Sequence, residues 1–168
     1  ADHLGVIFQQ FNLLPYLSLL ENVQLPCGFS QQKKANAGDM NASSRRLLAH
    51  LGLAESLLNQ PVSKLSVGQQ QRAAVARALI GSPEIVIADE PTSALDPETE
   101  SYLIEALQVA AKKKLVLIIA HRLSTITHAD RIYFLDDGEI IESGSHEKLM
   151  LDQDGRYRQY VDLQTARN

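Results

Sequence analysis

Two uninterrupted apolar runs constrain the fold of this chain more than any other feature. They span residues 85–88 and 115–120, and a helix is predicted between them from about residue 97 to 111, with Pro97 in its first turn. An uninterrupted apolar run, unlike an alternating one, is typical of a strand that is covered on both faces of its sheet. The order strand, helix, strand therefore predicts a parallel α/β sheet with both faces covered.

Weaker patterns predict the elements before these runs. Residues 6–8 indicate a short buried strand with only five residues before it, so the predicted sheet is joined midway. Residues 10–62 look helical and irregular, and the polar stretch 31–44 within them predicts a loop or a frayed helix. Residues 68–80 predict one more helix.

The last part of the chain predicts a hairpin and two helices. Strands at residues 131–135 and 139–142 flank Asp136, Asp137 and Gly138, and glycine accepts the positive φ that a tight turn requires. Residues 146–164 predict two short helices that are broken near Gly155.

Composition excludes several classes of function. The 168 residues suffice for one domain, and a net charge of −4 offers no electrostatic attraction to nucleic acid. A single cysteine, Cys27, excludes an internal disulfide and fits a reducing compartment, where it is expected to be a small buried residue. No run approaches the roughly 18 apolar residues that cross a bilayer, so the chain is expected to be soluble by itself and to reach a membrane only through a partner.

Two carboxylates follow the apolar run 85–88. Asp89 and Glu90 lie at the predicted carboxyl edge of a parallel strand, where open α/β sheets bind ligands. One carboxylate there suits Mg²⁺, which keeps most of its waters, and the next could orient or deprotonate an attacking water. The alternative is that one of them merely caps the following helix.

The string LSVGQQQR at residues 65–72 predicts an anion site. Ser66 is a candidate N-cap, and Gly68 lets backbone amides approach a ligand closely. A hydroxyl, free N–H groups and the positive end of a helix together attract an anion. By itself, however, the string would also fit an ordinary serine-capped helix.

Together with IVIADEPTSALD at residues 85–96, this string resembles the ATP-binding-cassette (ABC) family. Residues 65–72 are similar to the family signature LSGGQ, and residues 85–96 to its Walker B strand and D-loop; Arg77, Ala78, Leu79 and Pro83 also match in type and spacing. The resemblance implies an α/β fold, a P-loop NTPase-like parallel sheet core (incomplete here) with an inserted α-helical subdomain. Residues 1–9 would be a remnant of the core ending at the Q-loop, 10–62 the helical subdomain, and 63–168 the signature helix and the rest of the core.

The resemblance also assigns catalytic and metal-binding roles, with ATP and Mg²⁺ as cofactors. Gln9 matches the Q-loop glutamine, which senses Mg²⁺ and the attacking water and links the site to the membrane partner. Asp89 matches the Walker B aspartate that holds the metal, and Glu90 the catalytic glutamate. His121 matches the switch histidine that contacts the γ-phosphate.

Four further residues are implied to act across an interface between two cassettes. Ser66, Gly68 and Gln69 match signature residues that contact the γ-phosphate of ATP held by the opposite subunit, and Asp96 matches the D-loop aspartate at the dimer interface. The expected partners are therefore a second ABC ATPase domain, in a homodimer or pseudo-dimer, and a transmembrane permease. The expected location is peripheral, at the cytoplasmic face of the inner membrane.

The sequence departs from the family pattern in two places. Val67 stands where the family usually has glycine, and its β-branched side chain restricts the backbone there. The phosphate loop G-x-x-x-x-G-K-[ST], which precedes the Q-loop in this family, does not occur. The chain alone is therefore expected to bind ATP weakly or not at all, to be inactive, and to self-associate through exposed strand edges and apolar surface.

The direction of transport is open. Two sets of segments point to different kinds of cassette. Stand-alone cassettes of the lipoprotein-release and macrolide-efflux type have segments similar to residues 11–15, 20–23 and 65–96. Cassettes fused to exporter membrane domains have segments similar to residues 121–126, 129–132 and 144–147. Export is favoured and uptake is the alternative. The substrate is expected to be selected by membrane segments that are not present in this sequence. Just past Gln9, the best candidates for contact with the permease are Phe11, Leu14, Pro15 and Tyr16, which could instead pack within the helical subdomain.

Two hypotheses from other classes compete with transport. One is an ABC-type protein that acts on nucleic acid, but such relatives usually carry coiled coils, zinc motifs or a second cassette, which do not occur in this sequence. The other is an inactive interaction or regulatory module. The joint presence of Asp89, Glu90 and His121 argues against a decayed enzyme.

Overall fold

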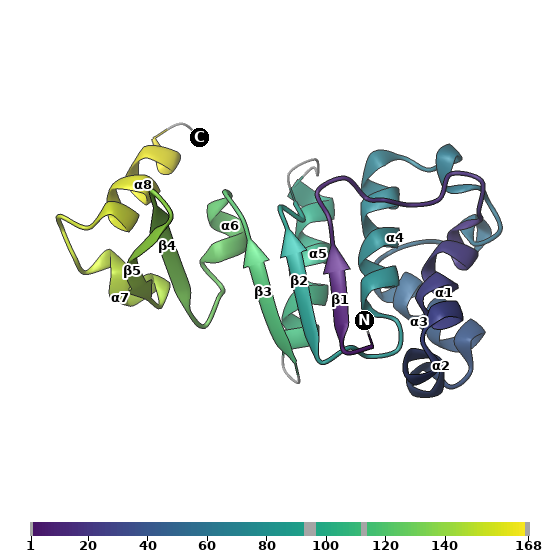
Figure 1. Ribbon diagram of the computed structural model, residues 1–168. Helices are drawn as coiled ribbons and strands as arrows, with labels where there is room; N and C mark the ends of the chain where they lie inside the picture. The colour runs from purple at the N-terminus through teal and green to yellow at the C-terminus, as the bar shows by residue number, and fades with distance from the viewer. Residues whose placement is uncertain (1, 93–96, 112–113, 167–168) are drawn as a thin grey trace. The chain divides into compact units, whose positions relative to one another are not determined.

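A three-stranded parallel sheet forms the centre of the first of two compact units. The computed structural model describes residues 2–92, 97–111 and 114–166, and its units are Ala1–Ile119 and Ala120–Asn168. In the first unit, strands β1 (Leu4–Ile7), β2 (Ile85–Asp89) and β3 (Leu115–Ile119) lie in that order (Figure 1). The register pairs Val6 with Ile87 and Ile87 with Leu117, so the three strands end at a common carboxyl edge.

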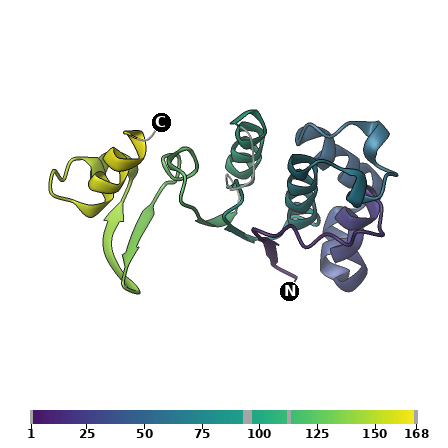
Figure 2. The same ribbon diagram turned by 90° about the horizontal axis from the view of Figure 1, so that it is seen from above.

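Two helices cover one face of this sheet. Helix α4 (Val67–Leu79) packs on β1 and α5 (Pro97–Ala111) packs on β3, and both lie on the same side, as Figure 2 shows. Each crossover between parallel strands is right-handed as a rule, and the strand order advances in one direction, so both connecting helices reach the same side. Ile7, Val86 and Ala88 point to that side and are fully buried.

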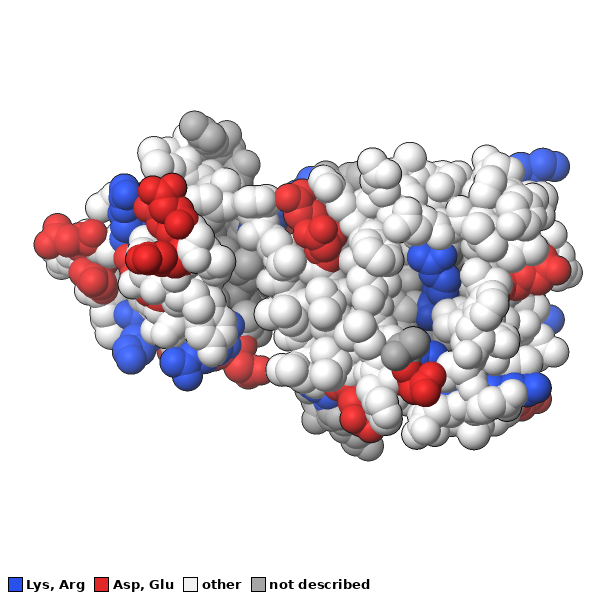
Figure 3. Space-filling view, in the orientation of Figure 1, with Lys and Arg blue, Asp and Glu red and all other residues white. Residues whose placement is uncertain are grey.

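The prediction that both faces are covered is wrong for the described residues. On the opposite face Leu115, Leu117 and Ile119 are 64%, 50% and 51% exposed. In Figure 3 this area over the strands is largely uncharged, with acidic atoms at its upper margin, where the strands end. On the α4 and α5 side β2 is buried at Val86 and Ala88, but β3 is only half-buried there, at Val116 and Ile118, so the apolar runs do not reveal which faces this chain itself covers.

Helices α1 (Leu19–Phe29), α2 (Gln31–Ala37) and α3 (Met40–His50) follow β1, and the 3₁₀ turns η1 (Glu55–Leu57) and η2 (Val62–Lys64) lead to α4. The polar stretch 31–44 is ordered helix for most of its length, which corrects the prediction of a loop or a frayed helix. Side-chain caps explain this: the Ser30 hydroxyl accepts from Lys33 N, and the Asp39 carboxylate from Ala42 N. Gly38, at φ 62°, ends α2 between these caps.

The segment between β1 and α1 is held by Asn22, which is fully buried on α1. Its Oδ1 accepts from Leu14 N at 2.8 Å, and its Nδ2 donates to the carbonyls of Leu14, Leu17 and Ser18. A single amide therefore satisfies several main-chain groups of this loop. Helices α1 and α3 in turn pack against α4.

The second unit has its own small core. Helix α6 (Leu123–Ile126) precedes the hairpin of β4 (Ile132–Asp136) and β5 (Glu139–Gly144), whose turn residues Asp137 and Gly138 both have positive φ. Helices α7 (His146–Met150) and α8 (Arg156–Thr165) then follow. Glu142 accepts hydrogen bonds from the first two main-chain N–H groups of α8, at 2.6 and 3.1 Å, and so fixes the start of that helix against the hairpin.

Replacing Asn22 tests how much its amide contributes. Asn22→Leu keeps the branching of the side chain at Cγ, but Leu14 N loses its hydrogen-bond acceptor. We expect the free energy of unfolding to fall by about 1–3 kcal/mol, measured by urea denaturation. The control is Gln24→Leu on the same helix. Among the described residues Gln24 donates to the exposed Asn41 alone, so the change should stay within about 0.5 kcal/mol. Equal losses in both variants would contradict this role of Asn22.

Candidate functional site

The carboxyl edge of the sheet brings together two of the predicted site residues. Gln9 follows β1 and Glu90 follows β2, and because these strands are parallel neighbours, both side chains reach the same edge. The Gln9 Nε2 donates to Glu90 Oε2 at 3.1 Å. Residues 81 positions apart in the sequence thus form one polar pair, with Gln9 exposed and Glu90 half-buried.

The main chain of Glu90 is strained. Its φ is 44°, in the left-handed region that non-glycine residues rarely adopt, and its N donates to the Ile119 carbonyl at 2.8 Å. Such a conformation costs on the order of 1–3 kcal/mol and persists where the surrounding structure imposes it, commonly at functional sites. Here the strand β3 holds the residue immediately after β2 and so aims its carboxylate along the edge.

Asp89 is the last residue of β2 and is half-buried beside Glu90. Across the described ranges, no three His, Cys, Asp or Glu side chains are grouped so that they could hold a metal by themselves. Mg²⁺ needs no such group, because it usually binds one or two carboxylates and completes its shell with waters and substrate phosphates. The donor set of Asp89, Glu90 and the Gln9 amide oxygen fits Mg²⁺ in that manner.

The signature string forms the start of α4, as the N-cap prediction for Ser66 requires. The Ser66 hydroxyl accepts from Gln69 N at 3.3 Å, and the Gln69 Oε1 accepts from Ser66 N at 2.9 Å, which is a capping box. Gly68 is half-buried, and Val67 beside it is 53% exposed. Because the Ser66 oxygen accepts in the box, its own proton stays available for an acceptor such as a phosphate oxygen.

The structure does not test the placement of two other predicted residues at this edge. Asp96 falls outside the described residues. His121 belongs to the second unit and is exposed, and its carbonyl accepts a hydrogen bond from the Tyr160 hydroxyl of α8. The roles of both remain predictions.

Sequence reasoning missed the side chains that hold the segment after Gln9. Arg77 of α4 donates to the carbonyls of Asn12 and Phe11, at 2.5 and 2.7 Å, and Asn22 bonds the stretch that follows. The sequence indicates Arg77 only as a match to the family pattern, and Asn22 only as part of residues 20–23, which resemble stand-alone cassettes. The sequence cannot predict the hydrogen-bond partners of Asn22 and Arg77. Most of these partners are main-chain carbonyls, which every residue has.

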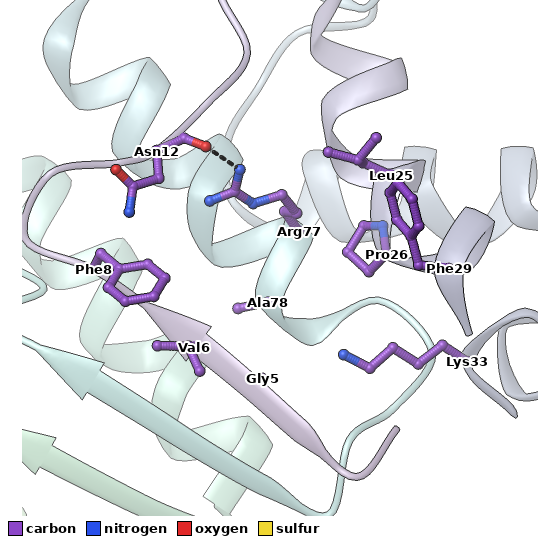
Figure 4. Close-up of a pocket in the computed structure, with 10 residues that line it drawn as sticks. All are labelled: Gly5, Val6, Phe8, Asn12, Leu25, Pro26, Phe29, Lys33, Arg77 and Ala78. Carbon is purple, nitrogen blue, oxygen red and sulfur yellow. Dashed lines mark hydrogen bonds between the residues drawn. The ribbon is translucent and has the colours of Figure 1, made fainter. Parts of the chain in front are cut away.

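A groove of about 330 Å³ lies between β1 and helices α1, α2 and α4. Figure 4 shows Phe8 on one side of it, Leu25, Pro26 and Phe29 on the other, and Lys33 beneath. Lys33 Nζ donates to the Leu4 carbonyl at 2.8 Å, and burial lowers the pKa of this ammonium group. The groove thus has mainly apolar walls, with the Lys33 ammonium group beneath them.

Comparison with known proteins identifies the class. The sequence profile of the family described as ABC transporter matches residues 1–93. The L-cystine transport system ATP-binding protein TcyN of Escherichia coli is 41% identical over 165 residues, which is 96% of this chain and 64% of that protein. The macrolide export ATP-binding/permease protein MacB of Pasteurella multocida is 41% identical over 88% of this chain and 22% of its own length.

Solved structures agree. The ATP-binding cassette MJ0796, an ABC transporter protein of Methanocaldococcus jannaschii solved as a dimer with ADP and phosphate, matches with a TM-score of 0.74 at 36% identity, over 86% of this chain and 63% of that one. The chain belongs to the ABC transporter ATPase family, and it spans less than two thirds of the length of these relatives. The predicted α/β, P-loop NTPase-like fold class is confirmed.

Paired substitutions test the strain at Glu90. Both Glu90→Gly and Glu90→Ala remove the carboxylate, but only glycine accepts a φ of 44° without a steric penalty. We expect Glu90→Gly to unfold with a free energy about 1 kcal/mol higher than Glu90→Ala, by urea denaturation. At the neighbouring Asp89, which is in the extended strand, the order should reverse, because glycine weakens a strand. The same order at both positions would show that Glu90 is not strained.

Proposed function

We propose that this chain is the catalytic part of a transport ATPase, in which the hydrolysis of ATP drives movement of a substrate across a membrane. The observation that carries the proposal is the pair of Gln9 and Glu90 at the carboxyl edge of the sheet, in a chain whose family consists of ABC transporter ATPases. A residue with an imposed left-handed main chain at this edge supports a catalytic role for Glu90.

Each residue of this edge has a chemical role in the proposal. Asp89 would hold Mg²⁺, which neutralises phosphate charge when it is bound. Glu90 would orient the attacking water and accept its proton, and Gln9, in contact with Glu90, would help to place that water. Hydrolysis by this mechanism requires a phosphate cradle in addition, and the sequence contains no G-x-x-x-x-G-K-[ST] loop.

The signature residues would act on a second cassette. Ser66, Gly68 and Gln69 at the start of α4 offer a hydroxyl and N–H groups to the γ-phosphate of ATP bound by the opposite subunit. Asp96 would lie at the dimer interface and His121 would contact the same phosphate. The dimeric structures of MJ0796 support a second ATPase domain as partner.

A permease would dock beside the Q-loop. In the segment after Gln9, Pro15 is exposed and Tyr16 is 75% exposed, whereas Phe11 and Leu14 are half-buried. Within the described ranges, none of the helices has the length and apolar character needed to cross a bilayer. The proposed location is therefore peripheral, at the cytoplasmic face of the membrane, through this partner.

Export is the proposed direction, supported by the exporter-like residues 121–126, 129–132 and 144–147. MacB, which is named for macrolide export, is among the relatives. Uptake is the second candidate, because the L-cystine and glutamine transport ATP-binding proteins TcyN and GlnQ of Escherichia coli are equally similar, at 41% identity each.

Turnover measurements test the proposed activity. The chain alone should neither bind ATP at micromolar concentration nor hydrolyse it, whereas the chain fused behind the phosphate-loop segment of a family member should do both, in a phosphate-release assay. In that fusion, Glu90→Gln should lower kcat by about 10²- to 10⁴-fold with little change in ATP binding, because it removes the base and keeps the shape. Glu84→Gln, on the exposed approach to β2, is the matched control and should keep full activity. Micromolar ATP affinity with turnover by the chain alone would overturn the inactivity proposal.

Val67 gives a second test. In the same fusion, Val67→Gly restores the family residue and removes the β-branched side chain from the first turn of α4, so turnover should rise severalfold. Val67→Ala is the intermediate control, which removes the branching but keeps a Cβ. Unchanged kcat in both variants would show that this position tolerates valine.

A further inference from the structure

Arg77 forms two hydrogen bonds with the main chain just after Gln9. Its Nη1 donates to the carbonyl of Asn12 at 2.5 Å, as the dashed line in Figure 4 marks, and its Nη2 donates to the carbonyl of Phe11 at 2.7 Å. A planar guanidinium makes two such bonds in one fixed geometry, which a lysine cannot do. The two carbonyls belong to the residues two and three positions after Gln9.

Burial of Arg77 and the conformation of Asn12 both favour these two hydrogen bonds. The side chain is half-buried, and desolvation lowers the pKa of its guanidinium, so the two carbonyls replace water that has been lost. Asn12 has a φ of 49°, in the left-handed region, and its carbonyl and that of Phe11 both accept from the one guanidinium. The path of the chain from β1 to the helical part is therefore set at this point.

Arg77 also lies on the helix that begins with the signature. Ser66 caps α4 and Arg77 is in its last turn, so one rigid helix of 13 residues joins the two. We propose that Arg77 is a positioning residue for the ATPase reaction: it fixes the segment after Gln9 to α4, and thereby fixes Gln9 against Glu90 and makes it move with the signature helix. This rests on the proposed roles of Gln9 and Glu90.

A matched control lies on the same helix. Arg72 also donates from Nη1 to a main-chain carbonyl, that of Leu51 at 3.3 Å, and it is half-buried like Arg77. Its target lies at the end of α3 rather than beside Gln9. Removing either guanidinium should weaken the packing of α4, but only the loss of Arg77 should change the contact of Gln9 with Glu90.

The experiment measures the contact of Gln9 with Glu90 in the 168-residue chain itself. The side-chain amide resonances of Gln9 are recorded by NMR with and without Glu90→Gln, in otherwise unchanged protein and in Arg77→Met, Arg77→Lys and Arg72→Met backgrounds. We expect the response of Gln9 to Glu90→Gln to fall by about half or more in Arg77→Met, to be partly restored in Arg77→Lys, and to be unchanged in Arg72→Met. Hydrogen exchange of residues 10–17 should quicken about tenfold in Arg77→Met alone.

The outcomes separate positioning from general stability. An undiminished Gln9 response in Arg77→Met would overturn the proposal, and so would an equal loss in Arg72→Met. If Arg77→Met does not fold, Arg77→Lys decides: a reduced response supports positioning and an unchanged one refutes it. Because no step involves ATP, failure of the proposed ATPase function would show only in the turnover assay, and not in these spectra.

Discussion

Parallel pairing of β2 with β1 on one side and β3 on the other is the constraint on which the rest of the first unit depends. It fixes the carboxyl ends of all three strands at one edge, so Gln9 after β1 and Glu90 after β2 meet across 81 residues of sequence. It also sets the main chain of Glu90, whose N–H is held by the last residue of β3. The strand register thus brings the polar side chains to one edge of the sheet, and their chemistry can act together only because of it.

Helix α4 connects this edge to the helical part of the chain. It packs against β1, α1 and α3, and the capping box of the signature forms at its first turn. Polar side chains hold the loop that leaves β1: Arg77 from α4 and Asn22 from α1 form hydrogen bonds with its main-chain groups. The residues that hold the site in place are therefore hydrogen-bonded to backbone, which explains why they escape a search for reactive side chains.

Local signals predicted their elements well. The helix from Pro97 to Ala111, the cap at Ser66 and the tight turn at Asp137 and Gly138 all follow from short-range chemistry, and the structure has each of them. The stretch 31–44 was predicted wrongly, because its composition is polar while its order comes from caps at Ser30 and Asp39 and from packing. The coverage of the sheet was also predicted wrongly: β3 is an uninterrupted apolar run, yet one of its faces is exposed and the other is only half-buried.

The sequence by itself determined the family, the parallel α/β class of the sheet and the residue types at the carboxyl edge, because motif spacing and apolar runs are local properties of the chain. Only the tertiary structure decided that Gln9 touches Glu90, that Glu90 is held in a left-handed conformation, and that Arg77 ties the loop after Gln9 to the signature helix. Those facts depend on strand register and on which carbonyls a long side chain reaches once the helices have packed. Contacts between residues tens of positions apart are set by that packing, and no local pattern encodes them.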